Sequence, residues 1–147
     1  MISTSDFFTV SFQGKWFTQT NTHLLKEKKQ KVFLKELCIL TNKAKDKSSI
    51  TKKDENSVII NIDNRNFIKL LKVHKQTKLR VTINAIFQPI NYNLFKINYS
   101  IIKNKYIYEE YIYFVNNNLM FSMGLVKSIY NNKYYGTVVT SYIRLMS

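Results

Sequence analysis

Hydrophobic and polar side chains alternate with a period of two along most of the chain, and this pattern indicates strands with two unlike faces. In the first such segment, Trp16, Thr18 and Thr20 share one face, whereas Phe17 lies on the other. Residues 64–74 carry an apolar pattern that fits a helix and a strand equally well. The alternation predicts strands at residues 15–23, 31–40, 58–63, 79–87, 92–103, 105–115, 119–130 and 134–145.

Polar breaks separate these strands. Residues 116–118 and 131–133 are rich in asparagine, which tolerates the positive φ of tight hairpin turns. Near the start, Ser5 and Asp6 are expected to cap a short helix that ends at Gly14. Evenly spaced hairpins with almost no helix predict an all-β fold, either an antiparallel up-and-down barrel or a sandwich. Closure into a barrel removes exposed strand edges, and about eight strands enclose room for one small ligand.

The length and the apolar content of the chain limit its organisation. A chain of 147 residues that is 45% hydrophobic is expected to form one domain over residues 1–147. No apolar run approaches the roughly 20 residues that span a bilayer. The first residues lack both the basic region and the apolar region of a secretory signal. We therefore expect the protein to work in the compartment where it is made.

Cysteine and histidine are too few to suggest redox or metal chemistry. The one cysteine, Cys38, excludes an internal disulfide and a thiolate zinc site, and its apolar neighbours favour a buried structural thiol. His23 and His74 form no pair with metal-ligand spacing, so both are interpreted as ordinary polar residues. No metal is expected.

The net charge of +14, from 23 Lys and Arg against 9 Asp and Glu, invites a search for an anionic partner. Only three of these cations are arginines, and lysine is enriched together with Asn, Ile and Tyr, which AT-rich codons encode. Compositional drift, an anionic ligand or acidic partner, and nucleic acid all remain open as explanations. The lysine-rich residues 26–31 are interpreted as a solvated hairpin end, or else as a surface for an acidic partner protein.

Three blocks of sequence resemble one known family. Residues 14–25 read Gly-Lys-Trp-Phe-Thr-Gln-Thr-Asn-Thr-His-Leu-Leu, residues 109–114 read Glu-Glu-Tyr-Ile-Tyr-Phe, and residues 141–145 read Ser-Tyr-Ile-Arg-Leu. The S-type phycobiliprotein lyases carry Gly-Lys-Trp-Phe-Ser-Gln-Arg-Thr-Ser-His-His-Leu, Glu-Glu-Arg-x-Trp-Phe and Ser-Glu-Ile-Arg-Met in the same order. In its fold and in these blocks, the chain resembles that family of small lipocalin-like β-barrels.

The resemblance implies an activity and its partners. Family members attach an open-chain bilin to a cysteine of a phycobiliprotein subunit through a thioether. The implied substrate is a phycobilin, phycoerythrobilin or phycocyanobilin, with neither a metal nor a nucleotide. The implied partner is an apo-phycobiliprotein subunit, and the chain is expected to act alone, as a homodimer or as a heterodimer with a related lyase subunit. The implied location is the plastid stroma or the cyanobacterial cytoplasm.

The resemblance also implies roles for single residues. The family's propionate-binding arginines are one in the first block and two in a motif Asn-Leu-Arg-x-Arg, which matches residues 118–122 here. They correspond to Thr20, Met120 and Ser122, and the serine that follows the paired arginines corresponds to Gly124. The acidic residue that meets the pyrrole nitrogens is retained as Glu110, which is the expected catalytic residue. A bilin needs an apolar slot, a cation for each propionate and an acceptor for its nitrogens.

The expected centres of the two hairpin turns predict which residues pair on neighbouring strands. A turn centred on Asn117 places Glu110 opposite Gly124. A turn centred on Asn132 places Arg144 opposite Met120, so Arg144 is expected to hold a propionate. Trp16 is interpreted as a structural plug at one end of the barrel. The expected ligand-binding set around Glu110 is Arg144, Tyr142, Ser122, Met120, Gly124, Thr20 and Tyr113.

Two other functions remain open. The lost arginines favour a non-catalytic partner subunit of the same fold, or a carrier of another amphipathic anion. A basic nucleic-acid-binding barrel also fits lysines interleaved with aromatic residues, although no known RNA-binding motif is present.

Overall fold

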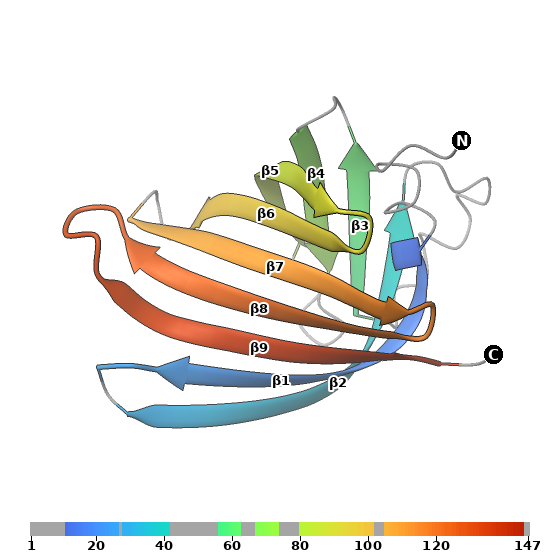
Figure 1. Cartoon of the computed structure of the whole chain (residues 1–147), viewed down its shortest axis with the longest axis horizontal. Coiled ribbons are helices and arrows are strands. Elements are labelled where there is room, and N and C mark those ends of the chain that lie inside the picture. The colour runs from blue at the N-terminus through green and yellow to red at the C-terminus, as the bar shows by residue number, and fades with distance from the viewer. Residues whose placement is uncertain are drawn as a thin grey trace.

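The described strands close into a barrel in chain order. The computed structural model describes residues 11–26, 28–41, 56–62, 67–73, 80–101 and 105–145. Within them each strand pairs with the next, and the last pairs with the first (Figure 1). This confirms the predicted all-β barrel. The strands are β1 (Gly14–Leu24), β2 (Lys29–Thr41), β3 (Ser57–Ile62), β4 (Phe67–Val73), β5 (Arg80–Asn91), β6 (Leu94–Ile101), β7 (Tyr106–Asn116), β8 (Leu119–Ser128) and β9 (Tyr134–Arg144).

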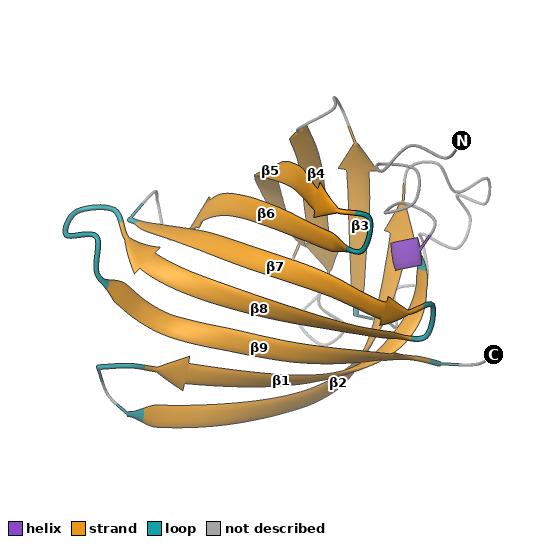
Figure 2. Cartoon of the chain, in the orientation of Figure 1, coloured by secondary structure: helices purple, strands orange, loops and turns teal. Residues whose placement is uncertain are grey.

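Helix is confined to one short turn before β1 in the described part of the chain (Figure 2). Ser11 and Phe12 belong to this turn, and Gly14 follows with a φ of 140°, which non-glycine residues rarely adopt. The caps expected at Ser5 and Asp6 lie outside the described residues. No helix in the described ranges is long and apolar enough to cross a membrane.

One neighbouring pair of strands runs parallel, which corrects the expectation of a purely antiparallel barrel. β2 and β3 pair in parallel from Cys38↔Ser57 to Thr41↔Ile60, whereas the other eight pairs are antiparallel. A closed ring with an odd number of strands cannot reverse direction at every step, so it must contain a parallel pair. Parallel neighbours need a connection of a dozen or more residues, and the chain between Thr41 and Ser57 has that length. The apolar segment whose pattern fitted a helix and a strand equally well contains the strand β4.

The β7–β8 hairpin has the predicted register. Glu110 pairs with Gly124, as a turn centred on Asn117 requires. Alternation along β7 therefore places Glu110 on the inner face together with Ile112 and Phe114, both of which are buried.

The β8–β9 hairpin differs from prediction by two residues, so the expected pairing of Met120 with Arg144 was wrong. The register shifts between Val126 and Lys127, and Asn132 takes its positive φ of 57° inside a longer turn than the one assumed. A shift of two residues keeps every side chain on its predicted face. The observed pairs are Met120↔Tyr142, Ser122↔Thr140 and Gly124↔Val138.

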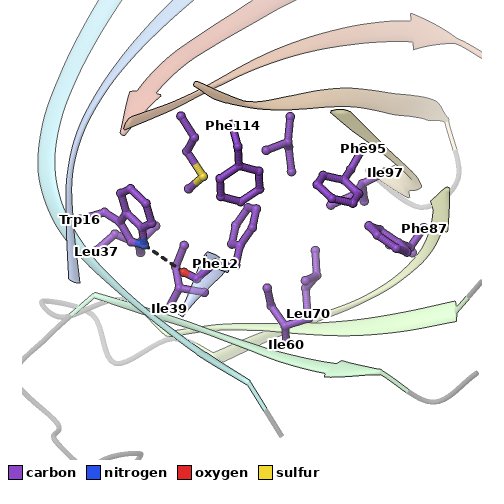
Figure 3. Packing of buried hydrophobic residues seen from close by; sticks show 13 residues of the cluster. Phe12, Trp16, Leu37, Ile39, Ile60, Leu70, Phe87, Phe95, Ile97 and Phe114 are labelled. Atoms are coloured by element: carbon purple, nitrogen blue, oxygen red, sulfur yellow. Dashed lines mark hydrogen bonds between the residues drawn. The ribbon is translucent and has the colours of Figure 1, made fainter. Parts of the chain in front are cut away.

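Aromatic rings fill one half of the barrel (Figure 3). Phe87 stacks on Phe95 at 5.4 Å, and Phe95 meets Phe114 edge-to-face at 5.9 Å. Phe12 meets Phe114 at 5.5 Å, so the turn before β1 packs into the barrel. Trp16 is fully buried, and its Nε1 donates to the carbonyl of Phe12 at 3.0 Å. This end of the barrel is therefore closed by side chains.

Arg144 closes the same end from β9. Its guanidinium lies 4.1 Å from the ring centroid of Trp16 and donates to the carbonyls of Ser11 and Gln13, each at 2.7 Å. Its Nε donates to the carbonyl of Asn117 at 2.8 Å. Burial lowers the pKa of Arg144 from its usual value. One cation therefore ties the first turn, the β7–β8 turn and the last strand together.

Gly14 makes room for this arrangement. A Cβ at Gly14 would overlap the Arg144 guanidinium, and the positive φ would strain any other residue. The glycine is thus required by both its conformation and its neighbour.

We expect Arg144→Leu to lower the free energy of unfolding by about 2–3 kcal/mol, because three carbonyls lose a charged donor. Arg144→Lys should be intermediate, since lysine keeps the charge but not the planar fork. Fluorescence of Trp16, the one tryptophan, measures the transition directly. Lys133→Leu, on the exposed β8–β9 turn, is the control; equal stability of Arg144→Leu and this control would contradict the closing role.

Candidate functional site

The other half of the barrel holds a cavity of about 250 Å³ that opens to solvent. Side chains from seven strands line it, so closure of the barrel brings together residues far apart in sequence. Its aliphatic wall is Leu37, Ile39, Val58, Leu70 and Val138. Its polar wall is Thr18, Thr20, Lys35, Asn56, Ser57, Lys72, Tyr99, Tyr108, Glu110, Thr140 and Tyr142.

Glu110 projects into this cavity from β7. Its carboxylate accepts hydrogen bonds from the hydroxyls of Ser122 and Tyr108. Burial raises the pKa of Glu110 above its usual value, while the nearby Lys72 and the two hydrogen bonds oppose that rise. The carboxyl group is therefore an acceptor whose proton affinity is strengthened by its surroundings.

Three tyrosines surround this carboxyl group. Burial raises the pKa values of Tyr99, Tyr108 and Tyr142 well above the usual phenol value, and the charge of Glu110 raises them further. All three therefore keep their hydroxyl protons at any physiological pH. Tyr99 and Tyr108 also pack ring against ring at 5.0 Å.

A chain of hydroxyl groups connects the carboxyl group to β1. Tyr142 hydrogen-bonds with Ser122 and Thr140. The hydroxyls of Thr140 and Thr20 lie 3.0 Å apart. A fully connected polar network holds its members in fixed positions, because each group loses a partner when any one moves. The network runs Thr20, Thr140, Tyr142, Ser122, Glu110 and Tyr108.

Two lysines give the cavity a net positive charge. Lys35 reaches it from β2 and stays exposed at its opening; burial of its stem and the charge of Lys72 lower its pKa. The Nζ of Lys72 lies 5.9 Å from the ring centroid of Tyr99. Among the charged residues that line the cavity, these two cations face the single acid Glu110. The cavity therefore suits a ligand with an acidic group and at least one hydrogen-bond donor.

Gly124 leaves the space that Tyr108 occupies. A Cβ at Gly124 would overlap the Tyr108 ring. Because Gly124 pairs directly with Glu110, this glycine allows the phenol to lie against the carboxyl group. Gly124 therefore determines where the Tyr108 ring lies without lining the cavity itself.

The structure brings only part of the predicted ligand-binding set to the cavity. Glu110, Thr20 and Tyr142 line it, and Ser122 and Gly124 support it from the wall. Met120 is fully buried in the aromatic half, and Tyr113 faces outward with 44% of its surface exposed. Arg144 lies at the closed end over Trp16 and is not part of the cavity lining.

Sequence reasoning missed both lysines. Lys35 lies two and four residues before the buried Leu37 and Ile39 on strand β2. Residues at this spacing share a face, so the position of Lys35 on the inner face could be predicted from the sequence. Lys72 shares a face with the buried Leu70 in the same way, but the pattern of its segment fitted a helix and a strand equally well. A lysine in phase with buried aliphatic residues was the missed signal.

Metal ligands do not cluster in the described part of the chain. No group of three or more His, Cys, Asp and Glu side chains there is placed to hold a metal ion. Cys38 is a partly buried thiol on β2, in phase with the outer face.

Comparisons with known proteins identify no family by sequence. No protein-family model matches the chain. No curated protein matches it either.

Solved structures share the fold. An S-type phycobiliprotein lyase, CPES, from Guillardia theta aligns with a TM-score of 0.55 and 8% identity over 99% of this chain and 94% of its own. A protein of unknown function of the DUF3598 family from Nostoc punctiforme aligns with a TM-score of 0.50 and 9% identity, over 93% of this chain and 49% of its own. The chain therefore has the barrel fold of an S-type phycobiliprotein lyase.

Proposed function

We propose that this protein binds an open-chain phycobilin and delivers it to a cysteine of an apo-phycobiliprotein subunit. The observation that carries the proposal is the acid Glu110 inside a cavity that also contains the cations Lys35 and Lys72. The shared fold and the three matching sequence blocks point to the same chemistry.

The ligand groups of a bilin match this set of side chains. Its two propionates need cations, and we assign them to Lys35 and Lys72 rather than to Arg144, whose donors are occupied at the closed end. Its pyrrole N–H groups need a buried acceptor, and Glu110 supplies one. The lysines thus replace the arginines that the resemblance implies at Thr20, Met120 and Ser122.

The cavity is too small to enclose a whole tetrapyrrole, and we infer that the reactive ring A lies at its opening. A volume of about 250 Å³ lies below the roughly 300–1,000 Å³ usual for ligand sites, so a tetrapyrrole must extend through the opening. Lys35 is exposed at that opening. A ring held at the opening is accessible to the thiol of another protein.

The reaction itself is an addition. The acceptor thiolate bonds through sulfur to the ethylidene carbon of ring A, the double bond is consumed, and the tetrapyrrole takes up a proton. The protein contributes by fixing one conformer and presenting the reactive carbon, which is catalysis by positioning. When ionised, Glu110 stabilises a protonated, more electrophilic tetrapyrrole through its N–H groups.

A second candidate is a carrier of a smaller amphipathic anion, or a non-catalytic partner subunit. The cavity volume and the replacement of the expected arginines by Thr20, Met120 and Ser122 favour it. Such a protein would bind the ligand without speeding attachment, so binding and transfer must be measured separately.

We expect the purified protein to bind phycoerythrobilin or phycocyanobilin. Binding should change the absorption spectrum of the bilin, and this change measures the affinity. Lys35→Met and Lys72→Met should each weaken binding about tenfold to a hundredfold, because a charge-assisted propionate bond is lost. Lys133→Met is the matched control and should bind like the wild type. Wild-type affinity in both cavity variants would show that the propionates are held elsewhere.

Glu110→Gln tests the buried acid through the pH dependence of stability. The folded carboxyl group binds its proton more tightly than the unfolded one, whose pKa is about 4.3. Between the two pKa values the folded state holds more protons, so the contribution of Glu110 to the free energy of unfolding falls as pH rises, and it levels off above the raised value. Urea titrations should therefore show Glu110→Gln gaining stability relative to the wild type as pH rises. Glu109→Gln, on the opposite face of β7, is the matched control; equal pH dependence of the two variants would contradict the assignment.

We expect attachment of the bilin to an apo-phycobiliprotein to be faster with this protein than without it, with the thioether at one acceptor cysteine. Denaturing gels that detect covalent bilin fluorescence, followed by peptide mapping, measure this. Bilin binding without faster attachment would favour the carrier.

A further inference from the structure

Strand β2 extends well beyond its neighbour β3. β1 pairs with β2 from Lys29 to Ile39, whereas β3 pairs only with Cys38–Thr41. Among the described strands, none pairs with the second edge of residues 29–37. In Figure 1, β1 and β2 project as a hairpin with β2 outermost. Within the described residues, this part of β2 is therefore an open edge.

Two hydrogen bonds identify the backbone groups that face this edge. The amide of Cys38 donates to the carbonyl of Asn56 at 2.9 Å, on the β3 side. The carbonyl of Lys35 accepts from Thr18 Oγ1 at 3.0 Å, on the β1 side. Successive residues of a strand direct their backbone groups to opposite edges, so the even-numbered residues face the open side. The open edge is thus formed by the N–H and C=O groups of Val32 and Leu34, with those of Gln30 and Glu36 beyond them.

The side chains beside this edge are apolar and exposed. Val32 and Phe33 expose 53% of their surface, and Leu34 exposes 62%. They alternate between the two faces, so an added strand would find apolar contacts on both. An exposed edge with apolar side chains is a template for pairing with another segment.

The positive charge of the lysines along the edge favours a partner segment that is acidic. Lys28, Lys31 and Lys35 flank the apolar residues, and Glu36 is the one acid from Lys28 to Leu37. A second copy of the chain would bring the same lysines, and like charges on neighbouring strands destabilise pairing. An extended segment that alternates acidic and apolar residues complements both features of the edge.

We propose that residues 29–37 of β2 bind an extended acidic segment of a partner protein by strand addition. The segment pairs with the backbone of Val32 and Leu34 and places its carboxylates beside Lys31 and Lys35. The inference stands without the proposed function, because it uses the edge and not the cavity contents. Since Lys35 also lines the cavity opening, the bound segment lies next to that opening.

Amide hydrogen exchange measured by NMR tests the proposal directly on the wild-type protein. The probe is a synthetic peptide of alternating Val and Glu, matched in length to the open edge; a Val–Lys peptide of equal length is the control. In the free protein, the amides of Val32 and Leu34 should exchange rapidly, whereas that of Phe33, which faces β1, should be protected. The acidic peptide should slow exchange at Val32 and Leu34 about tenfold or more, and added salt should weaken the effect.

Two variants of one residue separate the backbone from the side chain. Leu34→Pro removes an edge N–H that β1 does not use, which an edge strand tolerates. It should weaken peptide binding about tenfold or more, whereas Leu34→Thr, which keeps the N–H, should stay within about threefold. Circular dichroism checks that both variants keep their strand content, and the exchange experiment needs neither variant.

Three results would overturn the proposal. Binding of the acidic peptide without protection of Val32 and Leu34 would place it elsewhere. Protection of both amides in the free protein at every dilution would mean that the chain covers its own edge. Protection that grows with protein concentration alone would identify a second copy as the occupant.

Discussion

An odd number of strands in a closed ring forces one parallel pair, and much of the molecule follows from where that pair lies. The chain places it between β2 and β3, where only four residue pairs join the strands. The rest of β2 continues without that neighbour, which leaves both the open edge and the opening beside Lys35. The cavity opening and the strand edge thus both lie where β2 runs beyond its short contact with β3.

The barrel divides into two halves with different tasks. At one end, Trp16 and Arg144 close the barrel with aromatic packing and charged hydrogen bonds, so the strands are held at a fixed spacing. In the other half, the carboxyl group of Glu110 is held by a network of hydroxyl groups beside two lysines. Burying an acid is unfavourable, and the hydrogen bonds from Ser122 and Tyr108 together with the charge of Lys72 offset part of that cost.

The fold was readable because its signal is local. Alternation along β1 and β7 to β9 placed Trp16 and Glu110 on the inner face, and the first Asn turn set the pairing of Glu110 with Gly124. The site was only partly readable because it depends on long-range register. A longer β8–β9 turn moved Arg144 by two residues, from the side of Met120 to the closed end. The inner-face position of Lys35 was readable from its phase with Leu37 and Ile39, whereas Lys72 lies in a segment whose pattern fitted helix and strand equally well.

The short β2–β3 contact also affects how the barrel moves. Local opening occurs first where the fewest backbone bonds and buried contacts must break. The β2–β3 contact has four residue pairs, against five to eleven between the other neighbouring strands, but its Ile39 and Ile60 are buried in the aromatic half. The part of β2 before Cys38 pairs with β1 alone among the described strands, so the projecting end of the β1–β2 hairpin can open locally while the aromatic half stays folded. Such opening would loosen the cavity wall at Lys35 and leave the packing around Trp16 at the closed end in place.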